Sequence, residues 1–240
     1  MVKVVARSHQ GLVRLRNEDA VYGDDLGRFA ILADGMGGLM AGEVASRTAV
    51  EVARIRLSRG TSPIAAPDDL EHVLQLSHDA VVARARKFNY VGKMGTTMLI
   101  WARADVSASQ PENSFFAHVG DSRIYTFTEG KLTQITRDHT LAQRRADSSE
   151  IGPEEESEAP DRHVLTQALG LPGLCKPDSG VVPPAQRLVM CSDGLTDLVS
   201  EAEIVEVMAT PDLGRCADDL LKAALDAGGR DNVSVVLLEF

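Results

Sequence analysis

The stretch FAILADG, residues 29–35, joins an uninterrupted apolar run to an acidic residue and a glycine. An apolar run of this length, bounded by a turn signal, predicts a strand of the core. Residues 187–193 repeat the arrangement and end in Asp193, and residues 115–121 repeat it with Gly120 before Asp121. The sequence therefore predicts buried strands that each bring a carboxylate to the end of a sheet.

Further strand-like runs, rich in β-branched, aromatic and apolar residues, surround these three. The predicted strands cover residues 2–6, 20–22, 29–33, 96–101, 114–119, 124–127, 188–192 and 233–240. Several lie too close together in the chain for helical crossovers, so we expect largely antiparallel sheets.

Apolar residues at helical spacing predict two helix pairs, one in each half of the chain. The first pair covers residues 41–58 and a helix that begins at Asp68, with Glu71 completing a capping box. The second pair comprises a helix capped by Ser200 and Glu203, followed by one from about residue 212 to residue 228. Helix pairs that bracket many strands predict an α+β fold in which helices cover packed sheets.

Composition excludes several classes of protein. The chain has 25 Lys and Arg against 35 Asp and Glu, a net charge of −10, which argues against a nucleic-acid or anionic-membrane partner. No apolar run approaches the roughly 18 residues of a membrane span, and the early Lys3 argues against a secretory leader. Cys175, Cys191 and Cys216 are odd in number and far apart, which indicates a reducing, cytoplasmic location.

Acidic residues lie where strands end or begin. Because the end of one antiparallel strand and the start of its neighbour share an edge, these acids can reach one rim. They are Glu18, Asp19, Asp34, Asp121, Asp193, Asp197 and Asp231. Any single Asp-Gly pair is explained by a hairpin turn. Converging carboxylates cannot all stay ionised without a cation, however, and an all-oxygen set suits Mg²⁺ or Mn²⁺ better than zinc or copper.

A series of motifs then resembles one family in order along essentially the whole chain. The motifs are GLVRLRNED at 11–19, ADGMGG at 33–38, MGTT at 94–97, VGDSR at 119–123, CSDGLTD at 191–197 and GRDN at 229–232. Together they resemble the metal-dependent PP2C-type (PPM) protein serine/threonine phosphatases in their bacterial form. The resemblance implies a single domain over residues 1–240, built as a four-layer α/β/β/α sandwich. Residues 138–140 and 165–170 resemble the edges of the family's flap segment, which implies a flap at about 138–170.

The resemblance also implies a centre of two divalent ions, Mn²⁺ or Mg²⁺. Asp34 would bridge the two ions. Asp193 and Asp231 would complete the first site, and Glu18 with the Gly35 carbonyl would serve the second. A water or hydroxide that bridges the ions would attack phosphorus, so no protein nucleophile would be needed.

Further roles follow from the same resemblance. Asp19 matches a position that holds a metal-bound water, and Asp121 and Asp197 match the ligands of a third, weaker ion. Arg14 matches the arginine that grips the substrate phosphate, because a guanidinium can bind two phosphoryl oxygens in its planar fork. Arg16 is interpreted as a solvated neighbour.

The histidines depart from the family's pattern. Many relatives have His where this chain has Met36 or Leu39, so no residue is assigned as the acid for the leaving group, and a metal-bound water is expected to supply that proton. His118 is predicted to be a core residue beside the site, and His163 a surface or flap residue.

The function implied is a signalling phosphatase that hydrolyses phosphoserine and phosphothreonine on proteins and opposes a Ser/Thr kinase, as a monomer. Two alternatives stay open: a metal-dependent hydrolase of small phosphate monoesters, and a silent phosphoprotein-binding module on the same scaffold. The acidic run at 154–158 favours basic substrate sequences, although solubility alone would explain it equally well.

Overall fold

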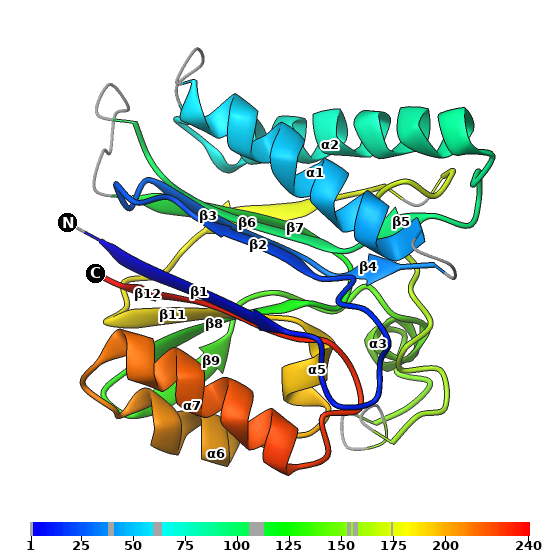
Figure 1. Cartoon of the computed structure of the whole chain (residues 1–240). Coiled ribbons are helices and arrows are strands. Elements are labelled where there is room, and N and C mark those ends of the chain that lie inside the picture. Colours follow the sequence, from blue (N-terminus) through cyan, green and yellow to red (C-terminus); the bar gives the residue numbers. More distant parts are fainter. Residues whose placement is uncertain are drawn as a thin grey trace.

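A computed structural model describes residues 2–37, 41–59, 64–105, 113–152, 155, 158–173 and 175–240. These residues form two five-stranded antiparallel sheets that stack face to face, with helices on both outer sides (Figure 1). The predicted α+β fold, with two central antiparallel sheets flanked by helix pairs, is confirmed.

The first sheet contains the first and last strands side by side. Its order is β1 (Lys3–His9), β12 (Val233–Glu239), β11 (Arg187–Cys191), β8 (Arg123–Thr128) and β9 (Lys131–Gln134). The second sheet has the order β10 (Asp178–Val181), β7 (Ser114–Val119), β6 (Met98–Arg103), β3 (Phe29–Ala33) and β2 (Ala20–Gly23). A short ribbon of β4 (Gly35–Met36) and β5 (Gly95–Thr96) continues from the ends of the neighbouring strands β3 and β6.

The position of β3 between two packed layers explains why its sequence is apolar throughout. Phe29, Ile31 and Ala33 pack into the layer under the helices, whereas Ala30 and Leu32 pack into the layer between the sheets. Because successive side chains of a strand point to opposite faces, a strand buried on both faces needs an apolar residue at every position.

Helices α1 (Ala41–Ser58) and α2 (Pro67–Phe88) cover the second sheet, and α6 (Glu201–Met208) and α7 (Leu213–Asp226) cover the first (Figure 1). Helix α1 buries a row of small residues at every fourth position, from Ala41 and Ala45 to Ala49 and Ala53. This row lies on one face of the helix and allows close approach to its neighbours. No helix among the described residues is long and apolar enough to cross a membrane.

Several boundaries differ from the predictions. The strand expected at 96–101 is interrupted at Thr97, and β9, β10 and the short helices α3 (Leu141–Asp147) and α5 (Asp193–Thr196) lack a clear sequence signal. The predicted Asp68–Glu71 capping box is wrong, because the helix begins at Pro67 and Asp69 accepts the N–H groups of residues 65 and 66. The Ser200–Glu203 box is confirmed by reciprocal hydrogen bonds.

Candidate metal centre

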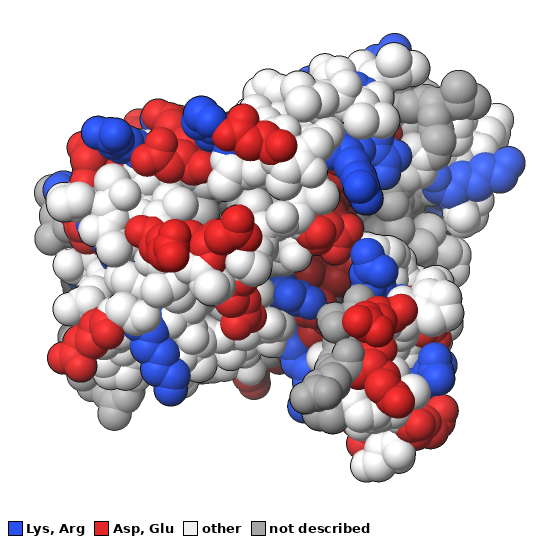
Figure 2. All heavy atoms as spheres, turned by 90° about the horizontal axis from the view of Figure 1, so that it is seen from below, with Lys and Arg blue, Asp and Glu red and all other residues white. Residues whose placement is uncertain are grey.

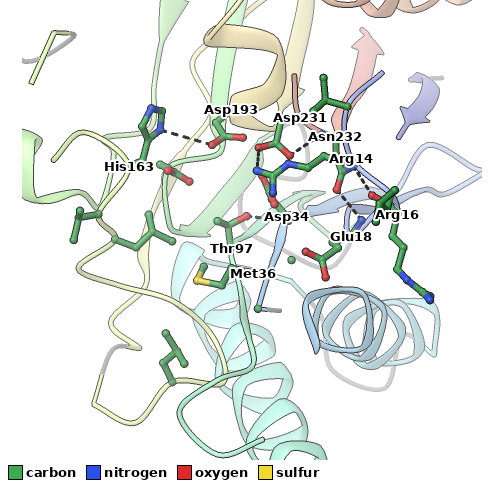
Figure 3. Close-up of a pocket in the computed structure, with 18 residues that line it drawn as sticks. Arg14, Arg16, Glu18, Asp34, Met36, Thr97, His163, Asp193, Asp231 and Asn232 are labelled. Atoms are coloured by element: carbon green, nitrogen blue, oxygen red, sulfur yellow. Dashed lines mark hydrogen bonds and ion pairs between the residues drawn. The ribbon is translucent and has the colours of Figure 1, made fainter. Parts of the chain in front are cut away.

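Five of the seven predicted acids line an open cleft of about 1030 Å³ at one end of the two sheets. Lining carboxylates come from strand ends, strand starts and the segments beside them: Glu18, Asp34, Asp121, Asp193 and Asp231. Figure 3 shows Glu18, Asp34 and Asp231 directed toward a common space. The face in Figure 2 is hollowed beside a protruding lobe, with Asp and Glu inside the hollow and Lys and Arg along its edges.

Asp34 is held by its backbone. Its N–H donates to Thr97 Oγ1 at 3.0 Å, and its carbonyl accepts the Thr97 N–H and the Thr96 hydroxyl, each at 2.8 Å. The chain then continues into β4, so the alternative that Asp34-Gly35 is a simple hairpin turn is wrong. The break at Thr97 is therefore part of the site, because it supplies the groups that fix Asp34.

Gly35 is required by the close approach of three segments. A Cβ at this position would lie 2.3 Å from the Gly42 carbonyl oxygen and 2.5 Å from that of Glu18. Gly42 is similarly confined, since a Cβ there would lie 2.8 Å from Glu18 Oε1. These glycines let the start of α1 pack directly against the Glu18 segment.

Asp19 lies beneath the cleft and is 6% exposed. Its Oδ2 accepts hydrogen bonds from Ser192 Oγ at 3.0 Å and Ser234 Oγ at 2.6 Å. Its Oδ1 is buried without a hydrogen-bond partner among the described residues. A buried carboxylate oxygen in this state is costly unless a further donor or a cation serves it.

The acids raise one another's pKa values. Burial, and then the charges of Asp19 and Asp193, raise the pKa of Asp34 well above its usual value. Burial and Asp193 do the same to the pKa of Asp121, and burial raises the pKa of Glu18. The protein alone therefore does not stabilise these groups as carboxylates.

These observations fit divalent cations. Each cation would relieve the mutual repulsion. The carboxylate of Asp19, one oxygen of which is unpartnered, is close enough to Asp34 for its charge to raise the pKa of Asp34. The donors are almost all carboxylate and carbonyl oxygens, which suits Mg²⁺ or Mn²⁺. One oxygen each from Asp121 and Asp193 and one ring nitrogen of His163 also lie within 4.8 Å of one another.

His163 also lies at the site, although the sequence did not indicate this. It is 45% exposed, as expected for a flap residue, yet its Nδ1 lies 4.0 Å from Asp193 Oδ2 and its Nε2 lies 3.7 Å from Asp197 Oδ2. The prediction that His118 is a core residue is confirmed, because it is 1% exposed. Met36 lines the cleft, whereas Leu39 lies outside the described residues.

The loop before Asp121 is clamped by His139. The Gly120 N–H donates to His139 Nδ1 at 3.1 Å, and the His139 N–H donates to the Gly120 carbonyl at 3.0 Å. His139 Nε2 lies 3.2 Å from Asp178 Oδ2. Because Nδ1 must accept from Gly120, the proton resides on Nε2 and points to Asp178.

Arg14 and Arg16 occupy different places. Arg14 Nη2 lies 2.5 Å from Asp231 Oδ2, among the acids of the centre (Figure 3). Arg16 also lines the cleft, but its Nη1 lies 3.9 Å from Glu43 Oε2 at the start of α1. The structure thus separates two arginines that are two positions apart in the sequence.

Asn232 organises the segment that carries these arginines, a role the sequence did not single out. Its Nδ2 donates to the carbonyls of Gln10 and Arg16, each at 2.8 Å, and its Oδ1 accepts the Glu18 N–H at 2.8 Å. One side chain therefore fixes both ends of the loop. The GRDN motif at 229–232 includes Asn232 but does not indicate this role.

Known proteins share this architecture. A family model described as "Protein phosphatase 2C" matches residues 7–227. The serine/threonine protein phosphatase PstP of Mycobacterium tuberculosis is 35% identical over 244 residues, covering 100% of this chain and 45% of that protein. This chain thus spans about half the length of that relative. The serine/threonine phosphatase stp of Listeria innocua is 34% identical, covering 97% of this chain and 94% of its own.

A solved structure extends the likeness to three dimensions. It is the crystal structure of the catalytic domain of PstP in complex with two manganese ions, with a TM-score of 0.85 and 34% identity. The match covers 99% of this chain and 97% of that one. By the family model, the sequence relatives and the shared fold, this chain belongs to the protein phosphatase 2C family.

Proposed function

We propose that this chain is a metal-dependent protein serine/threonine phosphatase that hydrolyses phosphoserine and phosphothreonine monoesters. The observation that carries the proposal is the convergence of buried, mutually repelling carboxylates in one open cleft. The names of the relatives and the two manganese ions of PstP support it. Without a bound cation, the repulsion between these buried carboxylates would destabilise the fold.

We assign the core ligands residue by residue. Asp34 would be shared by two ions; Asp193 and Asp231 would hold one, and Glu18 with the Gly35 carbonyl the other. When bound, the cation pair supplies an activated water nucleophile and neutralises charge on the phosphoryl oxygens. Asp19, which is fixed by two serine hydroxyls, would accept a hydrogen bond from a metal-bound water.

We also propose a third, weaker ion held by Asp121 and Asp197. Asp121 is 9% exposed, and the side chain of Asp197 is 38% exposed. His163 lines a small pocket together with both residues and Asp193. Residues 138–170 would act as the flap, and we propose that they and the sheets belong to one domain over residues 1–240. An antiparallel bridge between Thr96 and Leu169 joins that segment to β5.

Arg14 is proposed to bind the phosphate, because its guanidinium lies among the metal-site acids and cannot lose its proton. Replacing Arg14 by Ala should raise KM for a phosphopeptide by about 10- to 100-fold, as expected for loss of a charge-assisted bidentate contact. Arg16→Ala is the matched control and should change KM less than about threefold. Equal effects of the two substitutions would contradict the assignment to Arg14.

Phosphorylated proteins are the proposed substrates, with a Ser/Thr kinase in opposition and the chain acting as a monomer. The acidic run at 154–158 lies largely outside the described residues, which include only Glu155 and Glu158 of it. A preference for basic substrate sequences therefore stays a prediction.

The deciding experiment is phosphate release from a phosphothreonine peptide with Mn²⁺ or Mg²⁺, beside a chelator control and Asp193→Ala. We expect activity only with metal and with Asp193 intact. Activity that survives both chelation and the substitution would contradict the metal mechanism. Turnover of small phosphate esters but of no phosphopeptide would favour the small-molecule alternative, and phosphopeptide binding without turnover would favour the silent module.

A further inference from the structure

Large aliphatic side chains are exposed along the edges of the cleft. On the segment that carries Arg14, Val13 is 64% exposed and Leu15 is 93% exposed, and both line the cleft. On the segment that carries His163, Val164 is 47% exposed and also lines it. Figure 3 shows His163 and Arg16 on different sides of Asp34, and the two aliphatic groups belong to the segments that carry these two residues.

Scattered exposed aliphatic residues are normal on soluble proteins, but a group of them around a functional site indicates a binding surface. Phe88 and Phe240, which are exposed elsewhere, are contacted by Lys87 and by Trp101. The cleft edges are further lined by Leu165 and Leu171, so the apolar surface continues from rim to interior. This continuity with the acidic centre ties the surface to whatever occupies the centre.

We propose that these edges bind apolar side chains of the substrate on both sides of the phosphorylated residue, an inference that rests on the proposed function. A polypeptide that crosses the cleft with its phosphate among the acids must pass between the two edges. In an extended peptide alternate side chains face the same surface. The residues two positions before and two positions after the phosphoresidue therefore face the protein, about 7 Å along the chain from it on either side.

The preferred substrate class is thus a phosphoprotein segment with bulky apolar residues at positions −2 and +2. Val13 and Leu15 would contact one of these residues, and Val164 the other. Leu165 and Leu171, which are half-buried, would form the inner part of the second contact. Apolar residues at −1 and +1 would point away from the protein and contribute little.

The test uses four phosphothreonine peptides of equal length. They carry Leu at −2 and +2, Ser at these positions, Lys at these positions, or Leu moved to −1 and +1. Phosphonate analogues, which cannot be hydrolysed, give Kd independently of turnover. We expect the −2/+2 Leu peptide to bind about tenfold more tightly than the Ser peptide, the scale of burying one large aliphatic group. The −1/+1 Leu peptide should bind like the Ser peptide.

Leu15→Ser and Val164→Ser should each lower the ratio of Leu-peptide to Ser-peptide affinity by about threefold or more. Leu26→Ser is the matched control, because Leu26 is 60% exposed and does not line the cleft. It should leave the ratio unchanged.

Equal affinities for the Leu and Ser peptides would overturn the proposal, as would a stronger preference for the Lys peptide. So would an affinity ratio that Leu15→Ser and Leu26→Ser alter alike. Failure of the phosphatase assignment would look different: no peptide ester would be hydrolysed, while the phosphonate affinities would still decide the role of the edges.

Discussion

The acidic centre has an inner half and an outer half, and the two are built differently. Asp34 directly follows β3, Asp193 is the first residue of α5 two positions after the end of β11, and Asp19 precedes β2 and is fixed by buried serine hydroxyls. The outer half consists of Asp121 on a glycine loop, Asp197 at the end of a short helix, and the half-exposed His163. The strands next to Asp34 and Asp19 hold the backbone of these residues in place. The positions of Asp121 and Asp197, on a loop and at the end of a short helix, depend on a few side-chain contacts.

The largest effect should come from the inner half. Asp34→Asn removes the carboxylate assigned to both core ions, so we expect kcat to fall by about 10³-fold or more. In metal-free protein the same change should stabilise the fold, because it removes one charge from a repelling buried group. Turnover and thermal unfolding, with and without Mn²⁺, measure both effects. Asp25→Asn, at an exposed position, is the control; equal loss of activity there would contradict the prediction.

Asp121→Ala separates the two halves. We expect kcat to fall by about 10- to 100-fold while both core ions stay bound, since the inner ligands come from other segments. Counting bound metal in crystals of the variant checks this. Loss of all ions together with activity would show that the halves are one cooperative site.

His139 offers a sharper test of how the outer half is held. Asn places an acceptor near the position of Nδ1 and can keep the Gly120 hydrogen bond, whereas Gln extends to the position of Nε2 and leaves the Gly120 N–H without its partner. We expect about tenfold lower kcat for His139→Gln and near-normal kcat for His139→Asn. Hydrogen exchange at the Gly120 amide should rise in the Gln variant only. The reverse order would show that the contact to Asp178 matters more.

The last prediction concerns stability, and not activity, at the core beside the outer half. Burial, and then the neighbouring His139, lower the pKa of His118 to about 3, while the unfolded chain keeps a value near 6.5. Below pH 6.5 the unfolded state therefore binds more protons than the folded state. As the pH is lowered, the free energy of unfolding then decreases by up to about 1.4 kcal/mol per pH unit. Asp178 and His139 are the titratable groups that face His118.

Replacing His118 by Asn removes this dependence. Between pH 7 and pH 5 the free energy of unfolding of the unmodified protein should drop by about 2 kcal/mol relative to the variant. Denaturant unfolding at both pH values measures the difference, and the acids of the cleft, which have raised pKa values, act on both proteins alike. Parallel pH profiles would contradict the assignment of a neutral buried His118.

The inner half could be predicted from the sequence to a large degree. Apolar runs that end in Asp34 and Asp193 reveal buried strands with carboxylates at their ends, and an oxygen-only ligand set indicates the class of cation. In the outer half, Asp121 carries the same signal, because it follows the apolar run 115–119 and Gly120, whereas His163 carries none. The contact of His163 with Asp193 and Asp197 depends on where the segment after α3 folds, and nothing in its local sequence carries that information.

The sequence by itself determined the elements whose signals are local: strand and helix periodicity, the caps of helices such as Ser200 with Glu203, and the order of the family's motifs. Only the tertiary structure decided the contacts between segments far apart in the chain. Thr97 fixes Asp34, Asn232 ties together the ends of the Arg14 loop, and the Gly120 N–H sets the tautomer of His139. Periodicity reports which face of an element is buried, but the partner of a polar side chain is chosen by the packing of the layers.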